Sequence, residues 1–132
     1  MRIARFTLCL QVRDVAAATA FYTTHFGYRV LLDHGVFSKL RHGEGHELFF
    51  LQCGARVSPD DVVDAQPAAG LILALEVSDA AAELARLRDA GVAITGPLRD
   101  EPWGERLFQV RDPNGVTVQL VQWTQPPAGH AP

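Results

Sequence analysis

The feature that most constrains this chain is an internal repeat, because its second half follows the same pattern as its first. The segment Val12-Arg13-Asp14 recurs as Val77-Ser78-Asp79, 65 residues later. The glycine that ends each predicted helix recurs at almost the same distance, since Gly27 and Gly91 are 64 residues apart. Self-similarity over most of a chain indicates two copies of one structural unit. The sequence therefore predicts two similar modules joined by a linker.

The first module is predicted to contain a strand, a helix and then about three strands. Residues 6–12 are β-rich, and Asp14 is placed to cap a helix whose apolar residues recur at helical spacing. That apolar stripe consists of Val15, Ala18, Tyr22 and Phe26. Gly27 is a typical helix stop. Apolar runs at 36–40 and 48–51 flank a glycine-containing turn at 41–45, which predicts a hairpin.

The second module repeats this order after a segment without periodicity. Residues 54–70 contain two prolines and three aspartates, which is typical of a solvated linker. A strand is expected at 71–77, then a capping Asp79 and a helix with a buried stripe of Leu84, Leu87 and Ala90. Strands are expected at 92–94, 106–110 and 116–123, with turns at Gly96-Pro97 and at 112–115 and a loose tail after residue 125.

Composition narrows the class of protein. At 132 residues and 48% hydrophobic content, the chain is expected to form one domain over residues 1–132, with module one at about 5–53 and module two at about 71–123. A net charge of -3 offers no basic field for nucleic acid or anionic lipid. No segment has the length of a signal peptide or a membrane span, so we expect a cytoplasmic protein. Cys9 and Cys53 are expected to be free thiols.

Several motifs resemble the vicinal oxygen chelate superfamily, which includes glyoxalase I, extradiol dioxygenases and bleomycin-resistance proteins. In the first module these are Val12-x-Asp14, Phe21-Tyr22 and Phe26-Gly27, and the second repeats Val77-x-Asp79. The most specific are the segments 101–106, EPWGER, and 112–115, DPNG. The resemblance covers about residues 5–123. It implies an α+β fold of paired βαβββ modules forming an open, cup-shaped mixed sheet with the helices outside.

The resemblance also shows where a metal would be held. In metal-dependent members, the first and last strands of each module supply His, Gln or Glu side chains that point into the cup. The corresponding positions here are Thr7, Phe49 or Phe50, Ile72 and Gln119. A divalent cation needs carboxylate, imidazole or thiolate ligands, which threonine, isoleucine and phenylalanine cannot supply. The five histidines are expected to be exposed polar residues, so we expect neither a metal nor another cofactor.

Strand alternation predicts what lines the cup instead. If Thr7 points inward, Cys9 and Gln11 do so too, whereas Phe6, Leu8, Leu10 and Val12 pack against the helices. The first and last strands of the second module contribute a further set. That set is Ile72, Ala74, Glu76, Gln119, Val121 and Trp123. An apolar cavity with a few polar groups is typical of a small-molecule site.

Four of the expected ligand-binding residues have two interpretations each. In bleomycin-resistance-like proteins a Trp placed like Trp103 stacks on a planar ligand, but Trp103 could also merely cover the rim of the cup. Phe37 is either a second aromatic wall or an ordinary core residue. Glu76 would serve as a general base or as a counter-ion for a cationic ligand if it were desolvated, and otherwise is a partly solvated strand residue. Cys9 could be taken for a nucleophile, but an inert buried thiol is favoured.

Two functions remain open on the sequence alone. The first is a binding protein that sequesters an antibiotic or secondary metabolite, as the bleomycin-resistance group does. Its ligand would be a small organic and aromatic molecule, and the protein would act as a homodimer, the commonest oligomer. The second is a glyoxalase- or dioxygenase-like lyase, isomerase or oxidoreductase that uses a divalent metal or Glu76 as base.

Overall fold

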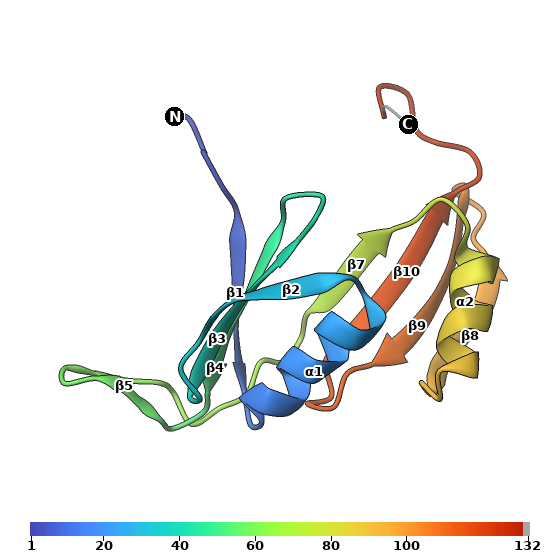
Figure 1. Cartoon of the computed structure of the whole chain (residues 1–132). Coiled ribbons are helices and arrows are strands. Elements are labelled where there is room, and N and C mark those ends of the chain that lie inside the picture. Colours follow the sequence, from blue (N-terminus) through green and yellow to red (C-terminus); the bar gives the residue numbers. More distant parts are fainter. Residues whose placement is uncertain (131–132) are drawn as a thin grey trace. The chain divides into compact units, whose positions relative to one another are not determined.

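A computed structural model of the chain describes residues 1–130. Its backbone contacts divide the chain into two compact units, Met1–Gly70 and Leu71–Pro132. Each unit has one helix and a four-stranded mixed sheet, so the predicted α+β class with paired βαβββ modules is confirmed (Figure 1).

The first unit has its strands in the spatial order β1-β4-β3-β2, with β1 parallel to β4 and the other neighbours antiparallel. Its elements are β1 (Thr7–Val12), α1 (Val15–His25), β2 (Tyr28–Asp33), β3 (Phe37–His42), β4 (Glu47–Gln52), β5 (Arg56–Ser58) and β6 (Asp61–Val62). The short β5–β6 hairpin lies in the predicted linker. No individual strand was predicted over β2, because most of its residues are exposed at the sheet edge and show no alternation.

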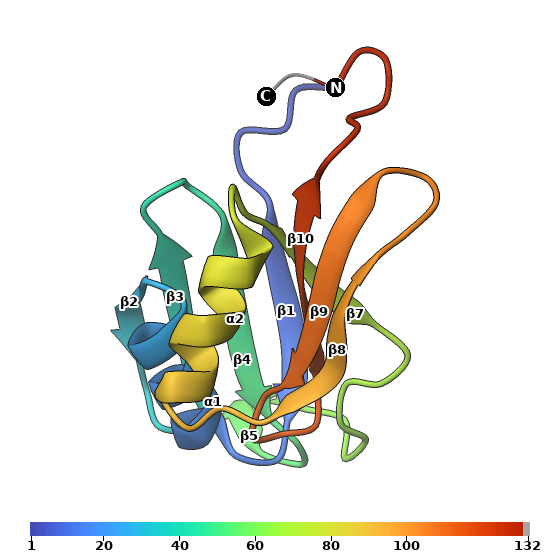
Figure 2. The same ribbon diagram turned by 90° about the vertical axis from the view of Figure 1, so that its right-hand side faces the viewer.

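The second unit repeats this topology in the order β7-β10-β9-β8, again with one parallel pair, β7 and β10. Its elements are β7 (Ile72–Glu76), α2 (Ala80–Asp89), β8 (Ile94–Asp100), β9 (Glu105–Arg111) and β10 (Thr117–Trp123). The long strands β9 and β10 lie side by side in Figure 2 and pair along their whole length. Neither of the two helices within residues 1–130 is long and apolar enough to cross a membrane.

The repeated helix starts form as predicted. Asp14 and Asp79 are both extended in backbone conformation, and each carboxylate accepts a hydrogen bond from the amide three residues later. These contacts satisfy amides that have no partner within the first helical turn. The two caps therefore fix equivalent helix starts in the two units.

The core of the first unit lies between α1 and one face of its sheet. Tyr22 of α1 is fully buried and stacks on Phe50 of β4, with ring centroids 5.4 Å apart. The hydroxyls of Thr19 and Ser38 are 2.7 Å apart, which satisfies the buried serine. In β1, Leu10 and Val12 are buried on this same side. Since strand residues alternate, the residues between them face the opposite side of the sheet.

Three local predictions are wrong. Phe6 does not pack against a helix: it precedes β1 and is 70% exposed. Ala90 is exposed because it caps the end of α2. The expected turn at Gly96-Pro97 is part of β8, an edge strand whose register with β9 shifts on both sides of Gly96. Proline is tolerated there because edge strands and bulges leave backbone amides unpaired.

Candidate functional site

The face of the first sheet that points away from α1 brings together five of the residues expected to bind a ligand. We call it the first distal face. It consists of Thr7, Cys9 and Gln11 on β1, Glu47, Phe49 and Leu51 on β4, and Phe37, Lys39 and Arg41 on β3. Strand β4 pairs in parallel with β1 and antiparallel with β3, and both registers place these residues opposite one another. They therefore share one side of the sheet. The five expected residues among them are Thr7, Cys9, Gln11, Phe37 and Phe49.

Aromatic rings form a continuous stack on this face. Phe37 and Phe49 are nearly parallel, with centroids 5.6 Å apart and planes inclined by 12°. The imidazole of His34 also stacks on Phe37, with centroids 4.7 Å apart and planes inclined by 25°. Phe37 and Phe49 are both half-buried, so part of each ring faces solvent. Such a stack can accept a further flat ring.

Beside the aromatic stack lies a charged cluster that the sequence analysis did not identify. Glu47 is fully buried, and its Oε1 accepts a hydrogen bond of 2.8 Å from the Thr7 hydroxyl. Its Oε2 accepts bonds of 2.8 and 2.6 Å from Nε and Nη2 of Arg41. Lys39 Nζ lies 3.5 Å from Oε1, and Arg5 Nε lies 3.9 Å from Oε2. Strand alternation could have indicated Glu47, which is two residues before Phe49.

The electrostatics of this cluster keep Glu47 ionised. Burial by itself would raise the pKa of this carboxyl group. Hydrogen bonds from Thr7 and Arg41, together with the charges of Lys39 and Arg41, outweigh that effect and lower the pKa to about 2. A buried carboxylate is stable only with such partners. Glu47 therefore holds a fixed negative charge that orients the cations around it.

Cys9 differs from the expectation of a buried thiol. It lies between Thr7 and Gln11 on the first distal face, and its side chain is exposed. The reason is the side of the sheet that it occupies, since α1 packs against the other face. Cys53, the second free cysteine, is half-buried just after β4.

In the second unit, four expected residues share the corresponding face of the sheet, the side away from α2. Ile72 and Glu76 lie on β7, and Gln119 and Val121 lie beside them on β10. Gln119 Oε1 accepts a hydrogen bond of 2.9 Å from Gln109 Nε2. Ile72 is 55% exposed.

Glu76 lacks the desolvation that a general-base role would require. Its side chain is 52% exposed, and one oxygen lies 3.2 Å from Nε2 of His130. The His130 ring in turn lies 5.4 Å from the ring of Trp123. Glu76 is therefore a partly solvated strand residue that holds the chain after β10.

Trp103 lies in the loop between β8 and β9 and is 59% exposed. Its indole nitrogen donates a hydrogen bond to the carboxylate of Glu105. The following residue, Gly104, accepts hydrogen bonds from Thr124 and Gln125 through its carbonyl. The loop is thus tied to the end of β10, and the indole face stays accessible.

The residues at the family's metal-binding positions do not fit a divalent metal. Phe49 and Ile72 carry no donor atom, the Thr7 hydroxyl is bonded to Glu47, and the Gln119 amide oxygen is bonded to Gln109. Within residues 1–130, no group of three or more His, Cys, Asp or Glu side chains is arranged to hold a metal ion. Glu47 is neutralised by arginine and lysine.

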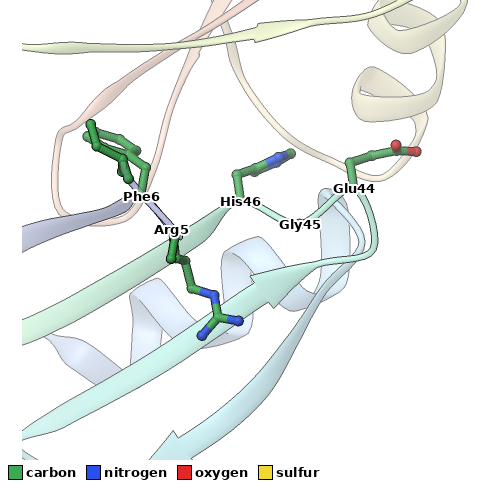
Figure 3. A pocket seen from close by; sticks show the side chains of 7 residues that line it. Arg5, Phe6, Glu44, Gly45 and His46 are labelled. Atoms are coloured by element: carbon green, nitrogen blue, oxygen red, sulfur yellow. The ribbon is translucent and has the colours of Figure 1, made fainter. Parts of the chain in front are cut away.

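A separate hollow of the first unit contains none of the expected ligand-binding residues. It lies between the N-terminal segment and the turn joining β3 to β4, and is lined by Ile3, Ala4, Arg5, Phe6, Glu44, Gly45 and His46. Figure 3 shows that Arg5 and Phe6 point to opposite sides of their segment. The hollow is open, and burial makes only a small contribution to binding in such a site.

The comparisons with known proteins agree on one family. The profile of the Glyoxalase/Bleomycin resistance protein/Dioxygenase superfamily matches residues 2–120. A glyoxalase/bleomycin resistance protein/dioxygenase from Nocardioides is 25% identical, with a TM-score of 0.77 over 100% of this chain and 91% of that one. TnmS3, an antibiotic binding protein from Streptomyces sp. CB03234, is 28% identical, with a TM-score of 0.69 over 93% of this chain and 98% of that one.

A third solved structure shares the fold. Lactoylglutathione lyase from Agrobacterium tumefaciens has a TM-score of 0.74 at 21% identity, covering 92% of this chain and 94% of that one. No curated protein sequence matches the chain.

Proposed function

The chain belongs to the Glyoxalase/Bleomycin resistance protein/Dioxygenase superfamily, and from this premise we propose that it binds and sequesters a planar aromatic antibiotic or secondary metabolite in the cytoplasm, without a metal. The observation that carries the proposal is the ring stack of His34, Phe37 and Phe49 on the first distal face. Aromatic side chains that stay partly exposed, beside a few polar groups, suit a flat ligand.

Two further observations support a binding role. Gln11 provides an amide on the same face as the rings. The Thr7 hydroxyl donates its proton to Glu47 but keeps lone pairs that can accept a hydrogen bond, so both residues can orient a ligand. In the second unit, Trp103 presents an exposed indole on a loop tied down by Gly104, and we assign it a stacking role of its own. The similarity to TnmS3, an antibiotic binding protein, is consistent with this class of ligand.

The residues at the family's metal positions support the metal-independent part of the proposal. Elemental analysis of the purified, dialysed protein tests it directly. We expect less than stoichiometric Ni, Zn, Fe and Mn. A metal that stays bound at one equivalent would contradict metal independence and favour an enzyme of the glyoxalase or dioxygenase kind.

The stacking surface is tested by titrating the protein with a panel of planar polycyclic antibiotics and following calorimetric heat or tryptophan quenching. Phe49→Leu and Phe37→Leu keep an apolar side chain but remove the ring. Each should weaken binding by roughly threefold to tenfold, the value of one aromatic pair. Phe6→Leu removes an exposed ring outside the first distal face and serves as the matched control.

Trp103→Ala tests the stacking role of Trp103 in the same titration. We expect the ligand-induced quenching to fall sharply, because the exposed indole would no longer contact the ligand. Unchanged affinity and quenching in this variant would contradict that role.

If the Phe37 and Phe49 variants bound every compound as well as the unmodified protein, the proposed surface would be wrong.

We also propose that the protein acts as a two-fold dimer, the commonest symmetry of soluble oligomers. Light scattering coupled to size-exclusion chromatography should give a mass of about twice the 14.4 kDa of the chain. A monomer at micromolar concentration would contradict this part of the proposal.

A further inference from the structure

The first distal face carries more positive than negative charge. Arg5, Lys39 and Arg41 all lie within 4 Å of the carboxylate of Glu47. Glu47 is completely buried, whereas the side chains of Arg5, Lys39 and Arg41 are 57%, 29% and 28% exposed. One carboxylate cannot neutralise three cations. Solvent, or a ligand, therefore meets a positive surface here.

A fourth cation strengthens this field. Arg29 of β2 lies directly opposite Arg41 of β3 in the antiparallel register. Like charges that face each other across two strands destabilise the pair. A negatively charged group bound beside them would relieve that repulsion.

Lys39 has hydrogen-bonding capacity to offer a ligand. An ammonium group has three donors. The distance of 3.5 Å from Nζ to Glu47 Oε1 is longer than the usual range for such a bond. Arg41 differs, because two of its donors already bind Glu47. Lys39 therefore makes no hydrogen bond of normal length to Glu47, and its ammonium donors are available to a ligand.

The same lysine lies beside the aromatic stack. In the register of β3 and β4, Lys39 is directly opposite Phe49. Phe49 in turn stacks on Phe37, the residue two positions before Lys39. A flat ring placed against Phe49 and Phe37 would therefore have its edge near the Lys39 ammonium group.

We propose that the ligand class of this site is a planar aromatic carboxylate. Its ring lies against Phe49 and Phe37, and its carboxylate pairs with Lys39. This inference rests on the proposed binding function and specifies the charge of the ligand. The positive surface disfavours cationic aromatic molecules.

Three probes that share one ring system test the charge preference. They are 2-naphthoate, 2-naphthalenemethanol and 2-naphthylmethylammonium, with charges of -1, 0 and +1. Isothermal titration calorimetry on the full chain at low salt should rank them in that order. We expect 2-naphthoate to bind roughly threefold to tenfold more tightly than the alcohol, the effect of one partly exposed ion pair.

Variants of Lys39 test the assignment to that residue. Lys39→Met should remove most of the preference for 2-naphthoate over the alcohol and leave the affinity for the alcohol unchanged. Lys39→Arg should keep most of the preference. Arg88→Met changes the net charge equally on the exposed part of α2 and should keep the full preference. Circular dichroism will show whether each variant is folded.

The outcomes separate this inference from the proposed function. Equal binding of the three probes, or tighter binding of the ammonium compound, would overturn the anion preference and leave the binding function intact. A preference for 2-naphthoate that is as large in Lys39→Met as in the unmodified protein would overturn the role of Lys39. If none of the three probes binds, the aromatic-carboxylate site is refuted. The proposed function would then depend on the antibiotic titration alone.

Discussion

Arg41 and Glu47 lie directly opposite each other on β3 and β4, and the guanidinium donates two hydrogen bonds to a single carboxylate oxygen. The carboxylate of Glu47 is buried, whereas Arg41 is partly exposed. The contact therefore joins a buried negative charge to a positive side chain that reaches the surface. Strong hydrogen bonds of this type involve two charged partners. The contact makes a buried acid compatible with a folded sheet.

The first prediction concerns acid stability. The pKa of Glu47 is about 2 in the folded protein, against an ordinary value of 4.5. A group whose pKa is lowered by folding contributes stability that is complete above 4.5 and is lost as the pH falls towards 2. Glu47→Gln should therefore reduce the pH dependence of the free energy of unfolding between pH 5 and 2. Urea denaturation at several pH values measures this.

Glu83→Gln is the matched control for that experiment. Glu83 pairs with Arg86 on the surface of α2, where ion pairs contribute little. Its loss should leave the pH dependence nearly unchanged. If the free energy of unfolding of Glu47→Gln depended on pH as steeply as that of the unmodified protein, the low pKa assigned to Glu47 would be wrong.

The second prediction tests the repeated helix caps. Asp14→Ala and Asp79→Ala each remove a side chain that accepts a hydrogen bond from a free amide of the first helical turn. Each should lower the free energy of unfolding by about 1 kcal/mol. Asparagine at either position should restore most of the loss, since its amide oxygen caps equally well. Chemical denaturation provides the measurement, and a loss as large for Asn as for Ala would contradict capping.

The third prediction compares two glycines with positive φ. A Cβ on Gly104 would lie 2.6 Å from the carbonyl oxygen of Gln125, whereas a Cβ on Gly115 meets no atom within 4 Å. Gly115→Ala should cost about 1 kcal/mol for the left-handed backbone alone. Gly104→Ala should cost about 1–3 kcal/mol more, because the clash is with backbone. Thermal or chemical unfolding of both variants measures the difference, and equal losses would contradict the close approach.

The fourth prediction concerns His46. Its pKa is lowered below 6.5 by desolvation and by the charge of His42, with Glu44 acting in the opposite direction. The two imidazoles are stacked, with centroids 4.8 Å apart. In an NMR titration, His42→Gln should raise the pKa of His46 towards its ordinary value. Because the pKa is lowered by folding, protonation of His46 should reduce stability as the pH falls through 6.5. A His46 pKa unchanged by the substitution would contradict this interaction.

The parts of the fold that were predicted correctly depend on neighbours in the sequence. Asp14 and Asp79 precede helices whose apolar residues recur at helical spacing, and both cap as expected. Alternation in β1 correctly separated Leu10 and Val12 from Cys9 and Gln11. The elements that were missed have weak local patterns: β2 is largely exposed, and β8 contains Pro97, which is normally a strand breaker.

The candidate site depended on contacts that no local pattern contains. Phe37 and Phe49 were both expected to bind a ligand, but their stacking follows from the register of β3 with β4. Glu47 and Thr7 are 40 residues apart and meet only because β1 and β4 pair in parallel. Alternation assigns each residue to a face of its own strand, whereas register decides which residue of the next strand it contacts.

The sequence by itself determined two copies of one module, because caps, glycine stops and strand alternation act over a few residues. Only the tertiary structure decided that Arg5, Lys39 and Arg41 surround one buried carboxylate and leave a positive surface beside the aromatic stack. The physical reason is that a charge can be buried only where the pairing of distant strands supplies its partners. That pairing is a property of the folded sheet.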